Sequence, residues 1–231
     1  MGLAHSPRIV TNGLVLCLDA GNTKSYPGSG TTWTDISRNG NNGTLTNGPT
    51  FSSNNKGIIT FDGANDYVIL TRPPELVNGG SITVALWARW TTTGTTVSTI
   101  QALLDNNHSG SPNQGFVLQD RPDLSKTLTF SVNAGVSGAQ STFQVGDGTW
   151  RHIVGTNDQS TTRLYIDGVL NAQASQAGLN VVQPNLSIGY WQFTPGRYLN
   201  GSIPQVLIYN RALSAAEVTQ IFNATRGRFG I

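Results

Sequence analysis

Apolar and polar residues alternate with a period of two along much of the chain. The pattern is strongest in the segment 82–90 and recurs at 128–132 and 164–166. This alternation is typical of a β-strand with one buried face. The apolar positions of the first segment are Ile82, Val84, Leu86, Ala88 and Trp90.

Turn dipeptides that end in glycine separate these alternating segments. They are Asn39-Gly40, Asn42-Gly43, Asn47-Gly48, Asp62-Gly63, Asn78-Gly79, Asp147-Gly148 and Asp167-Gly168. The last pair lies between two apolar segments and predicts a two-residue hairpin, because a type I′ turn needs positive φ at both central positions. Many short strands joined by such turns predict an all-β protein, an antiparallel sandwich.

One helix is predicted near the end of the sequence. Ser214 and Glu217 have the spacing of a capping box, and Leu213 and Val218 have that of a hydrophobic staple. The helix is expected to pack on the sandwich through one apolar stripe. That stripe consists of Val218, Ile221 and Phe222.

The limits of the folded domain follow from where these patterns stop. Arg226 is expected in the last helical turn, with Gly227 closing the helix. Residues 1–12 show no period and are predicted to form an N-terminal arm, which leaves 13–231 as a single domain. The 231 residues fit one large β-sandwich.

The composition excludes several classes of protein. Only 11% of the residues are charged and the net charge is +2, so nucleic acid is not an expected partner. Cys17 is the only cysteine, which excludes an intrachain disulfide and a zinc site built on several thiolates. The apolar run 14–18 is too short for a membrane span or a signal peptide, so we expect no membrane association and no export signal.

Six segments, taken in order, resemble laminin G-like domains of the concanavalin A-like lectin/glucanase fold. They are residues 13–21, 33–45, 61–68, 148–154, 164–168 and 208–218. The resemblance implies a two-sheet antiparallel jelly roll. The Asn/Gly-rich opening and the Arg-Phe-Gly ending are similar to laminin G-like domains in virion proteins of tailed phages, cyanophages especially. Fold alone does not decide function.

The carboxylates argue against an enzyme. Retaining glycoside hydrolysis needs two carboxyls about 5 Å apart. The two glutamates, Glu75 and Glu217, have no acidic neighbour two or four residues away. The pairs Asp62/Asp66 and Asp120/Asp123 lie in or beside turn-rich sequence, where Asp usually stabilises the turn. A glycosidase is therefore only a remote alternative.

No metal or other cofactor is expected. The resemblance implies an acidic calcium ligand at a position that Pro204 occupies here, and Asp62 or Asp66 alone would bind calcium weakly. The resemblance also implies that His152 is a core histidine bonded to a neighbouring loop or backbone group. Three further residues are interpreted as core residues rather than reactive groups: Trp33, Trp87 and Cys17.

The candidate binding residues lie in three loops. Exposed aromatic side chains stack on sugar rings or anchor protein interfaces, whereas a folded-back loop would bury them. Amide and guanidinium groups can donate hydrogen bonds to hydroxylated ligands. The candidates are Tyr190, Trp191 and Phe193 in the first loop, Asn107 and His108 in the second, and Arg121 in the third.

Two functions remain open, and neither requires catalysis. The preferred hypothesis is a virion structural or interaction protein, either a capsid decoration protein or a tail-associated component, made in the host cytoplasm. Its expected partners are other virion proteins and further copies of itself. The alternative is a carbohydrate-binding adhesin that recognises a host surface glycan through the loop of Trp191.

Overall fold

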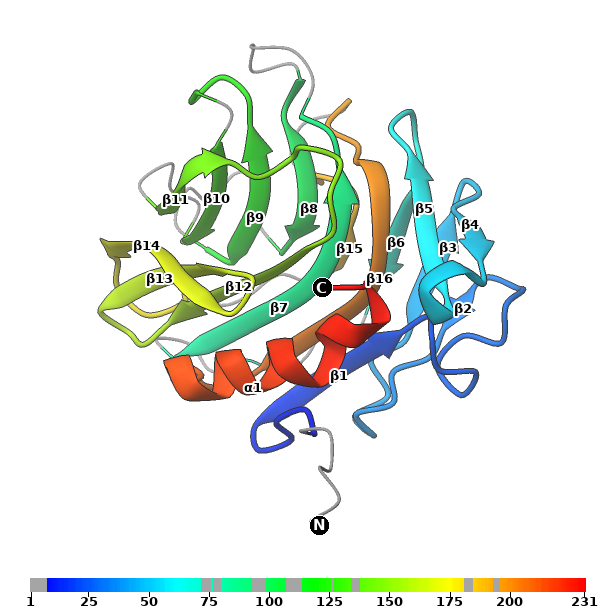
Figure 1. The fold of residues 1–231 in the computed structure, drawn as a ribbon, viewed down its shortest axis with the longest axis horizontal. Coiled ribbons are helices and arrows are strands. Elements are labelled where there is room, and N and C mark those ends of the chain that lie inside the picture. The colour runs from blue at the N-terminus through cyan, green and yellow to red at the C-terminus, as the bar shows by residue number, and fades with distance from the viewer. Residues whose placement is uncertain are drawn as a thin grey trace.

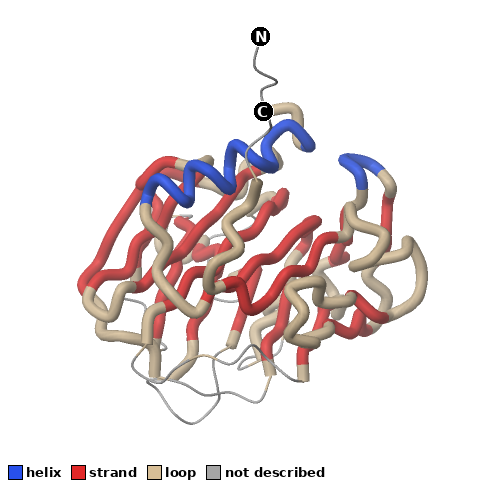
Figure 2. The backbone as a smooth tube through the Cα atoms, turned by 90° about the horizontal axis from the view of Figure 1, so that it is seen from below, coloured by secondary structure: helices blue, strands red, loops and turns tan. Residues whose placement is uncertain are grey.

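Two antiparallel β-sheets face each other in the computed structural model, and one helix lies along the outside of one sheet (Figures 1 and 2). The structure describes residues 8–71, 76, 80–92, 99–106, 114–125, 127–133, 138–180, 185–192 and 196–231. The predicted all-β sandwich with a short C-terminal helix is confirmed.

Sheet A carries the helix on its outer face. Its path runs β14-β13-β12-β7-β16-β5-β4, and β1 pairs with the second half of β16. Its strands are β1 (Leu14–Asp19), β4 (Thr50–Ser52), β5 (Ile58–Asp62), β7 (Ile82–Trp90), β12 (Arg151–Asn157), β13 (Thr161–Ile166), β14 (Val169–Ser175) and β16 (Asn200–Tyr209).

Sheet B closes the other side of the core in the order β11-β10-β9-β8-β15-β6-β3-β2. Its strands are β2 (Thr32–Trp33), β3 (Gly43–Thr46), β6 (Tyr67–Leu70), β8 (Gln101–Asp105), β9 (Phe116–Arg121), β10 (Thr127–Val132), β11 (Ala139–Gln144) and β15 (Leu186–Ile188). A short 3₁₀ helix, η1 (Asn54–Lys56), joins β4 to β5 of sheet A.

The alternation along β7 separates two hydrophobic cores. Its even-numbered apolar residues, Ile82 to Trp90, all point into the large core between the sheets. Ala85 belongs instead to a second core beneath helix α1 (Ala215–Thr225), together with Val218 and Ile221. The strand is thus buried on both faces, as its nearly continuous burial shows.

The structure confirms two features that the sequence predicted locally, a hairpin turn and a helix cap. Asp167 and Gly168 have φ angles of 51° and 81° and join β13 to β14. Ser214 caps α1, and the capping box with Glu217 is complete. Leu213 of the predicted staple is buried in the second core.

The predicted end of the helix is wrong. Gly227 does not take a positive φ; α1 ends at Thr225 and the chain continues as a 3₁₀ turn, η3 (Arg226–Arg228). The positive φ, 74°, occurs at Gly230. Tertiary contacts explain the difference, because the Arg228 guanidinium is paired with Asp19.

The end of the predicted N-terminal arm lies against the helix and sheet A. Val10 is buried, and its carbonyl accepts a hydrogen bond from the Tyr209 hydroxyl at 2.9 Å. The Arg8 carbonyl accepts one from Gln220 at 2.7 Å. Residues 1–7 lie outside the described residues, so the arm stays a prediction there.

Candidate functional site

Three tyrosines meet where the segment after β15 passes the start of β6. The rings of Tyr190 and Tyr198 stack with centroids 4.6 Å apart, and Tyr67 lies 5.2 Å from Tyr190. All three side chains are half-buried. Burial raises the pKa of Tyr190, so its hydroxyl stays protonated and able to donate near neutral pH.

Trp191 follows Tyr190 in the chain, and its ring is covered on one side by a cation. The Arg197 guanidinium sits 3.9 Å from the centroid of the indole ring, which is a close cation–π contact. Both side chains are half-buried, so each also reaches solvent. Burial and the charge of Arg121 lower the pKa of Arg197.

Arg121 forms a buried ion pair with Asp123. Its side chain is 8% exposed, and Nε and one terminal nitrogen donate to the two carboxylate oxygens of Asp123 at 2.8 and 2.7 Å. This bidentate pairing lowers the pKa of Asp123. Arg121 therefore reaches the site mainly through its charge, which acts on Arg197.

Backbone contacts hold this segment in place. The Tyr190 carbonyl accepts a hydrogen bond from Ser187 at 2.6 Å, and the Gln192 N–H donates to the buried Asp105 carboxylate at 3.1 Å. The Trp191 N–H donates to the Arg197 carbonyl at 3.2 Å. We call Tyr67, Tyr190, Trp191, Arg197 and Tyr198 the aromatic loop site.

The structure brings together some of the predicted binding residues. Tyr190 and Trp191 are neighbours in the aromatic loop site. Arg121, predicted in a loop, is instead the buried last residue of β9, so only its charge acts on Arg197. Phe193, Asn107 and His108 lie outside the described residues. Sequence reasoning missed two other groups of residues. Arg197 and Tyr198 follow in the same loop, whereas Tyr67 is distant in sequence and lies in segment 61–68, which was used only for the family resemblance.

Many carboxylates serve as structural partners. Six ion pairs of the described chain join Asp19 to Arg228, Asp123 to Arg121, Asp147 and Asp167 to Arg151, Asp158 to Arg163, and Glu217 to Arg211. Asp120 accepts a hydrogen bond from the Trp90 indole at 3.1 Å. Asp123 in turn pairs with Arg121. Both carboxylates of the Asp120/Asp123 pair therefore bind side chains of the fold itself.

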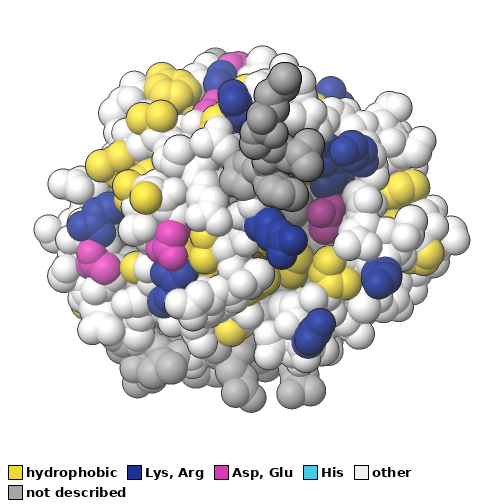
Figure 3. Space-filling model, turned by 60° about the horizontal axis from the view of Figure 1, so that its bottom comes forward, with side chains coloured by type: hydrophobic (Ala, Val, Ile, Leu, Met, Phe, Trp, Pro, Cys, Tyr) yellow, Lys and Arg dark blue, Asp and Glu magenta, His cyan; other side chains and the backbone are white. Residues whose placement is uncertain are grey.

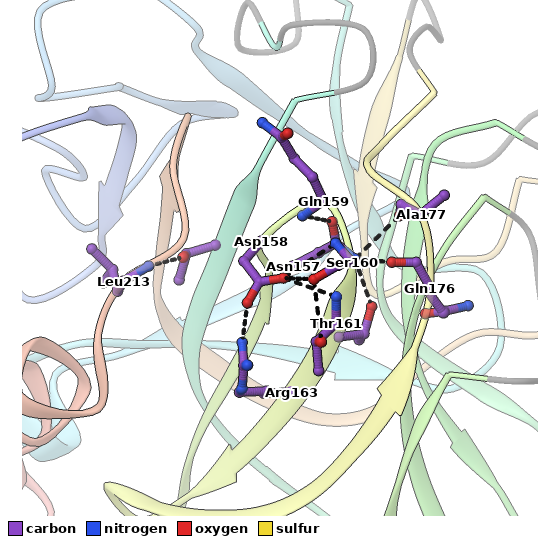
Figure 4. A network of polar contacts seen from close by, with 11 residues as sticks. Asn157, Asp158, Gln159, Ser160, Thr161, Arg163, Gln176, Ala177 and Leu213 are labelled. Carbon is purple, nitrogen blue, oxygen red and sulfur yellow. Dashed lines mark hydrogen bonds and ion pairs between the residues drawn. The ribbon is translucent and has the colours of Figure 1, made fainter.

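Asp158 illustrates this use of acidic groups in the turn between β12 and β13 (Figure 4). Its carboxylate accepts hydrogen bonds from the N–H groups of Ser160 and Thr161, and pairs with Arg163. The Arg163 contact keeps the pKa of Asp158 well below its usual range. Beside it, Asn157 is fully buried and donates to the Gln176 carbonyl.

Asp62 and Asp66 also act on a turn, as predicted. Asp62 accepts hydrogen bonds from the N–H groups of Ala64 and Asn65, which lowers its pKa. Asp66 is buried and accepts one from the Asp62 N–H. Among the described residues, no group of three His, Cys, Asp or Glu is placed to hold a metal ion.

The four residues interpreted as core residues are buried. Trp33 and Trp87 have no exposed surface, and burial raises the pKa of the Cys17 thiol to about 12. His152 is 1% exposed, and burial lowers its pKa to about 3. The expected hydrogen bond of its ring is not seen at Nδ1, which has no partner; the ring packs against Trp87 instead.

The surface shown in Figure 3 carries scattered charges. Lys and Arg side chains are distributed over the described part of this face, several of them beside Asp or Glu, without forming one large basic patch. Within the described residues, no helix is long and apolar enough to cross a membrane. A depression of about 460 Å³ beside the end of α1 contains Arg228, which is already paired with Asp19.

Comparison with known families assigns the fold. Residues 62–219 match the family described as the concanavalin A-like lectin/glucanases superfamily. The chain belongs to this superfamily. The matched region of this lectin-like chain spans most of both sheets and the aromatic loop site. No curated protein matches the sequence.

Solved structures of toxins and of a sialidase share the fold at low sequence identity. The binding domain of Paraclostridial Mosquitocidal Protein 1 is 18% identical, with a TM-score of 0.70 over 93% of this chain and 52% of that one. The binding domain of botulinum neurotoxin DC, in complex with SialylT, is 14% identical, with a TM-score of 0.73 over 94% and 52%.

A Trypanosoma rangeli sialidase in complex with 2,3-difluorosialic acid is 15% identical, with a TM-score of 0.66 over 92% of this chain and 33% of the enzyme. The lectin-like chain thus spans about half of each toxin binding domain and a third of the sialidase. At these identities the likeness shows the fold alone.

Proposed function

We propose that this lectin-like chain is a non-enzymatic carbohydrate-binding domain that recognises a surface glycan through the aromatic loop site. The observation that carries the proposal is the half-buried Trp191, whose ring is covered on one side by Arg197 and which follows Tyr190 of the tyrosine stack in the chain. Aromatic rings bind the apolar faces of sugars, while guanidinium and phenol groups donate to sugar hydroxyls.

Two further observations support this proposal. The anchoring of the loop backbone through Ser187 and Asp105 fixes the aromatic rings before a ligand arrives, which lowers the entropic cost of binding. One structure that shares the fold is described as a complex with SialylT. The structural use of the described carboxylates favours binding over hydrolysis.

A glycan array followed by calorimetry tests the proposal. We expect a dissociation constant between about 1 mM and 1 μM for a hit, and at least a tenfold loss in Trp191→Ala. Phe143→Ala is the matched control, because Phe143 is an exposed aromatic residue on β11, at the far edge of sheet B. Absence of any glycan ligand, or equal binding by Trp191→Ala, would contradict the proposal.

A role as a virion structural or interaction protein is the second candidate. It is favoured by exposed apolar side chains at a sheet edge: Val169 and Leu170 on β14 are 69% and 47% exposed, and Phe143 is 44% exposed. A hydrogen bond from the Thr142 N–H to Asn171 joins the two strands, so the apolar residues lie close together. Such patches mark protein contacts, with copies of this chain or other particle proteins.

Sedimentation tests this second role. The full chain should self-associate or co-sediment with virus particles, and the variant Val169→Lys with Leu170→Lys should do neither. A chain that stays monomeric and ignores particles contradicts this role and leaves the glycan proposal intact.

A further inference from the structure

A row of polar side chains crosses the outer face of sheet A. Cross-strand pairing places Thr60 of β5 beside Ser202 of β16, and Ser202 beside Arg89 of β7. The pairing of Arg151 with Ala88 in the next strand places Trp150 beside Arg89. The neighbours of these residues along each strand point into the core, so the row faces outward.

This row forms one side of a depression of about 310 Å³. The volume is at the small end of the range for ligand pockets. The side chains around it are mostly hydroxyl and amide groups, with one cation and no carboxylate. Its lining consists of Thr60, Arg89, Trp90, Thr91, Gly148, Asn200, Gly201 and Ser202.

Arg89 is the only charge in this lining, and its charge is uncompensated. The side chain is exposed, and its guanidinium lies 5.0 Å from the centroid of the Trp150 ring. Within the described residues it makes no ion pair. The nearby acidic groups are engaged elsewhere, since Asp147 pairs with Arg151 and Asp62 accepts backbone N–H groups of its own turn.

The surroundings of Arg89 fix its position. Phe229, which is buried, packs against the other part of the Trp150 ring system at 4.9 Å, so the platform under the guanidinium is held by the C-terminal segment. Thr60 and Ser202 share a hydrogen bond of 2.9 Å between their hydroxyls. Each hydroxyl keeps additional capacity to bond a ligand.

Gly201 lines the depression at a point where β16 and β7 approach closely. A Cβ atom at this position would lie 2.6 Å from the Arg89 carbonyl oxygen and 2.7 Å from Trp90 Cβ. Any larger residue would therefore displace the backbone of β7 or β16. Glycine at this position allows the two strands to approach next to Arg89.

From this arrangement we propose a second binding site, for a sugar acid: a ring with several hydroxyls and one carboxylate. The Arg89 guanidinium binds the carboxylate, and the hydroxyl groups of Thr60 and Ser202 and the exposed Asn200 amide bind the ring hydroxyls. A neutral sugar makes only the second set of contacts. The site shares no lining residue with the aromatic loop site, so each can be lost without the other.

Titration of the full-length protein with sodium glucuronate and sodium galacturonate, followed by NMR, tests this site. We expect binding of at least one acid, with glucose at least about tenfold weaker, and a tenfold loss in Arg89→Gln. Raising the salt concentration should weaken binding, since the site is open to solvent.

The matched control is Arg226→Gln. Arg226 is exposed and lies over an aromatic ring, Phe222, at 5.7 Å, but it does not line the depression. The Arg226→Gln variant should bind the sugar acids as the wild type does, and so should the Trp191→Ala variant. A thermal melt of Arg89→Gln confirms that the variant is folded.

The proposal is overturned if neither acid binds, if glucose binds as well as the acids, or if Arg89→Gln binds as tightly as the wild type. These results do not bear on the aromatic loop site, which is contradicted instead if no glycan on the array binds or if Trp191→Ala binds the array ligand as tightly as the wild type.

Discussion

Trp87 and Trp191 show two ways in which this chain surrounds a large aromatic ring. Trp87 has no exposed surface; its indole N–H donates to Thr225 at 2.8 Å, and its ring stacks on Phe229 at 4.2 Å. Trp191 is half-buried, and the long side chain of Arg197 covers one face of its ring. The Trp87 ring is part of the packing between sheet A and the C-terminal segment, whereas the Trp191 ring, the centre of the proposed glycan site, keeps some exposed surface.

The two rings differ in which parts of the chain cover them. Uncovering Trp87 requires the helix and the following 3₁₀ turn to leave sheet A, because Phe222 and Phe229 hold it from that side. The face of Trp191 that Arg197 covers is held by a single side chain rather than by a helix. A cation–π contact contributes about 0.5–2 kcal/mol, less than the burial of a core ring.

The largest expected effect is that of Trp87→Ala. We expect the free energy of unfolding to fall by about 3–5 kcal/mol, because the change leaves a cavity between sheet A and α1. Urea denaturation followed by circular dichroism measures it. A loss below about 1 kcal/mol would mean that the packing of Trp87 against Phe222 and Phe229 contributes little to stability.

The next effect is a dependence of stability on pH through His152. Burial lowers its pKa from the ordinary 6.5 to about 3, so the unfolded chain binds a proton at pH 5 and the folded chain does not. The stabilisation is complete above pH 6.5 and decreases as the pH falls. Between pH 6.5 and 5 the loss should approach about 2 kcal/mol.

His152→Leu is the control for this pH dependence. Denaturant titrations at pH 7, 6 and 5 should show a flatter pH profile for the variant than for the wild type. Glu217 titrates lower: Arg211 holds its pKa at about 2, so its contribution is lost only as the pH falls from 4.5 towards 2. Identical slopes for the two proteins would contradict a buried neutral His152.

A smaller effect is expected for Ser214→Ala at the start of α1. The change removes the oxygen that accepts from the Glu217 N–H, and we expect a loss of about 1 kcal/mol in the free energy of unfolding. Ser160→Ala, at an exposed turn outside the helix, is the comparison in the same denaturation assay. If both variants are equally stable, the cap does not hold the helix.

The smallest expected effect on stability is that of Trp191→Ala, below about 1 kcal/mol, since solvent already reaches the side chain. The same denaturation experiment as for Trp87→Ala measures it. Equal losses at the two positions would remove the distinction between a core ring and a ligand-binding ring.

The sequence predicted features that depend on neighbouring residues. The capping box joins Ser214 to Glu217 three positions away, and the Asp167-Gly168 turn depends on its own φ angles, so both were visible in the sequence. The alternation in β7 likewise identified its core face. Each of these features is fixed by local geometry.

Features that depend on distant contacts could not be predicted in the same way. Gly227 has the type and position of a helix-ending residue, but the pairing of Arg228 with Asp19 continues the turn past it. Tyr67 reaches Tyr190 only because β6 pairs with β15 in sheet B. Tyr190 and Trp191 were found because large aromatic residues stood in a loop.

The place of β16 in sheet A has a consequence for the time course of folding. This strand, the last that the structure describes, lies between β7 on one side and β5 and β1 on the other. At about 5–20 residues per second, synthesis of the roughly 110 residues between β7 and β16 takes on the order of 10 s. During that interval the two halves of the sheet have open edges, so a nascent chain depends on chaperones or on rapid closure to avoid pairing with its neighbours.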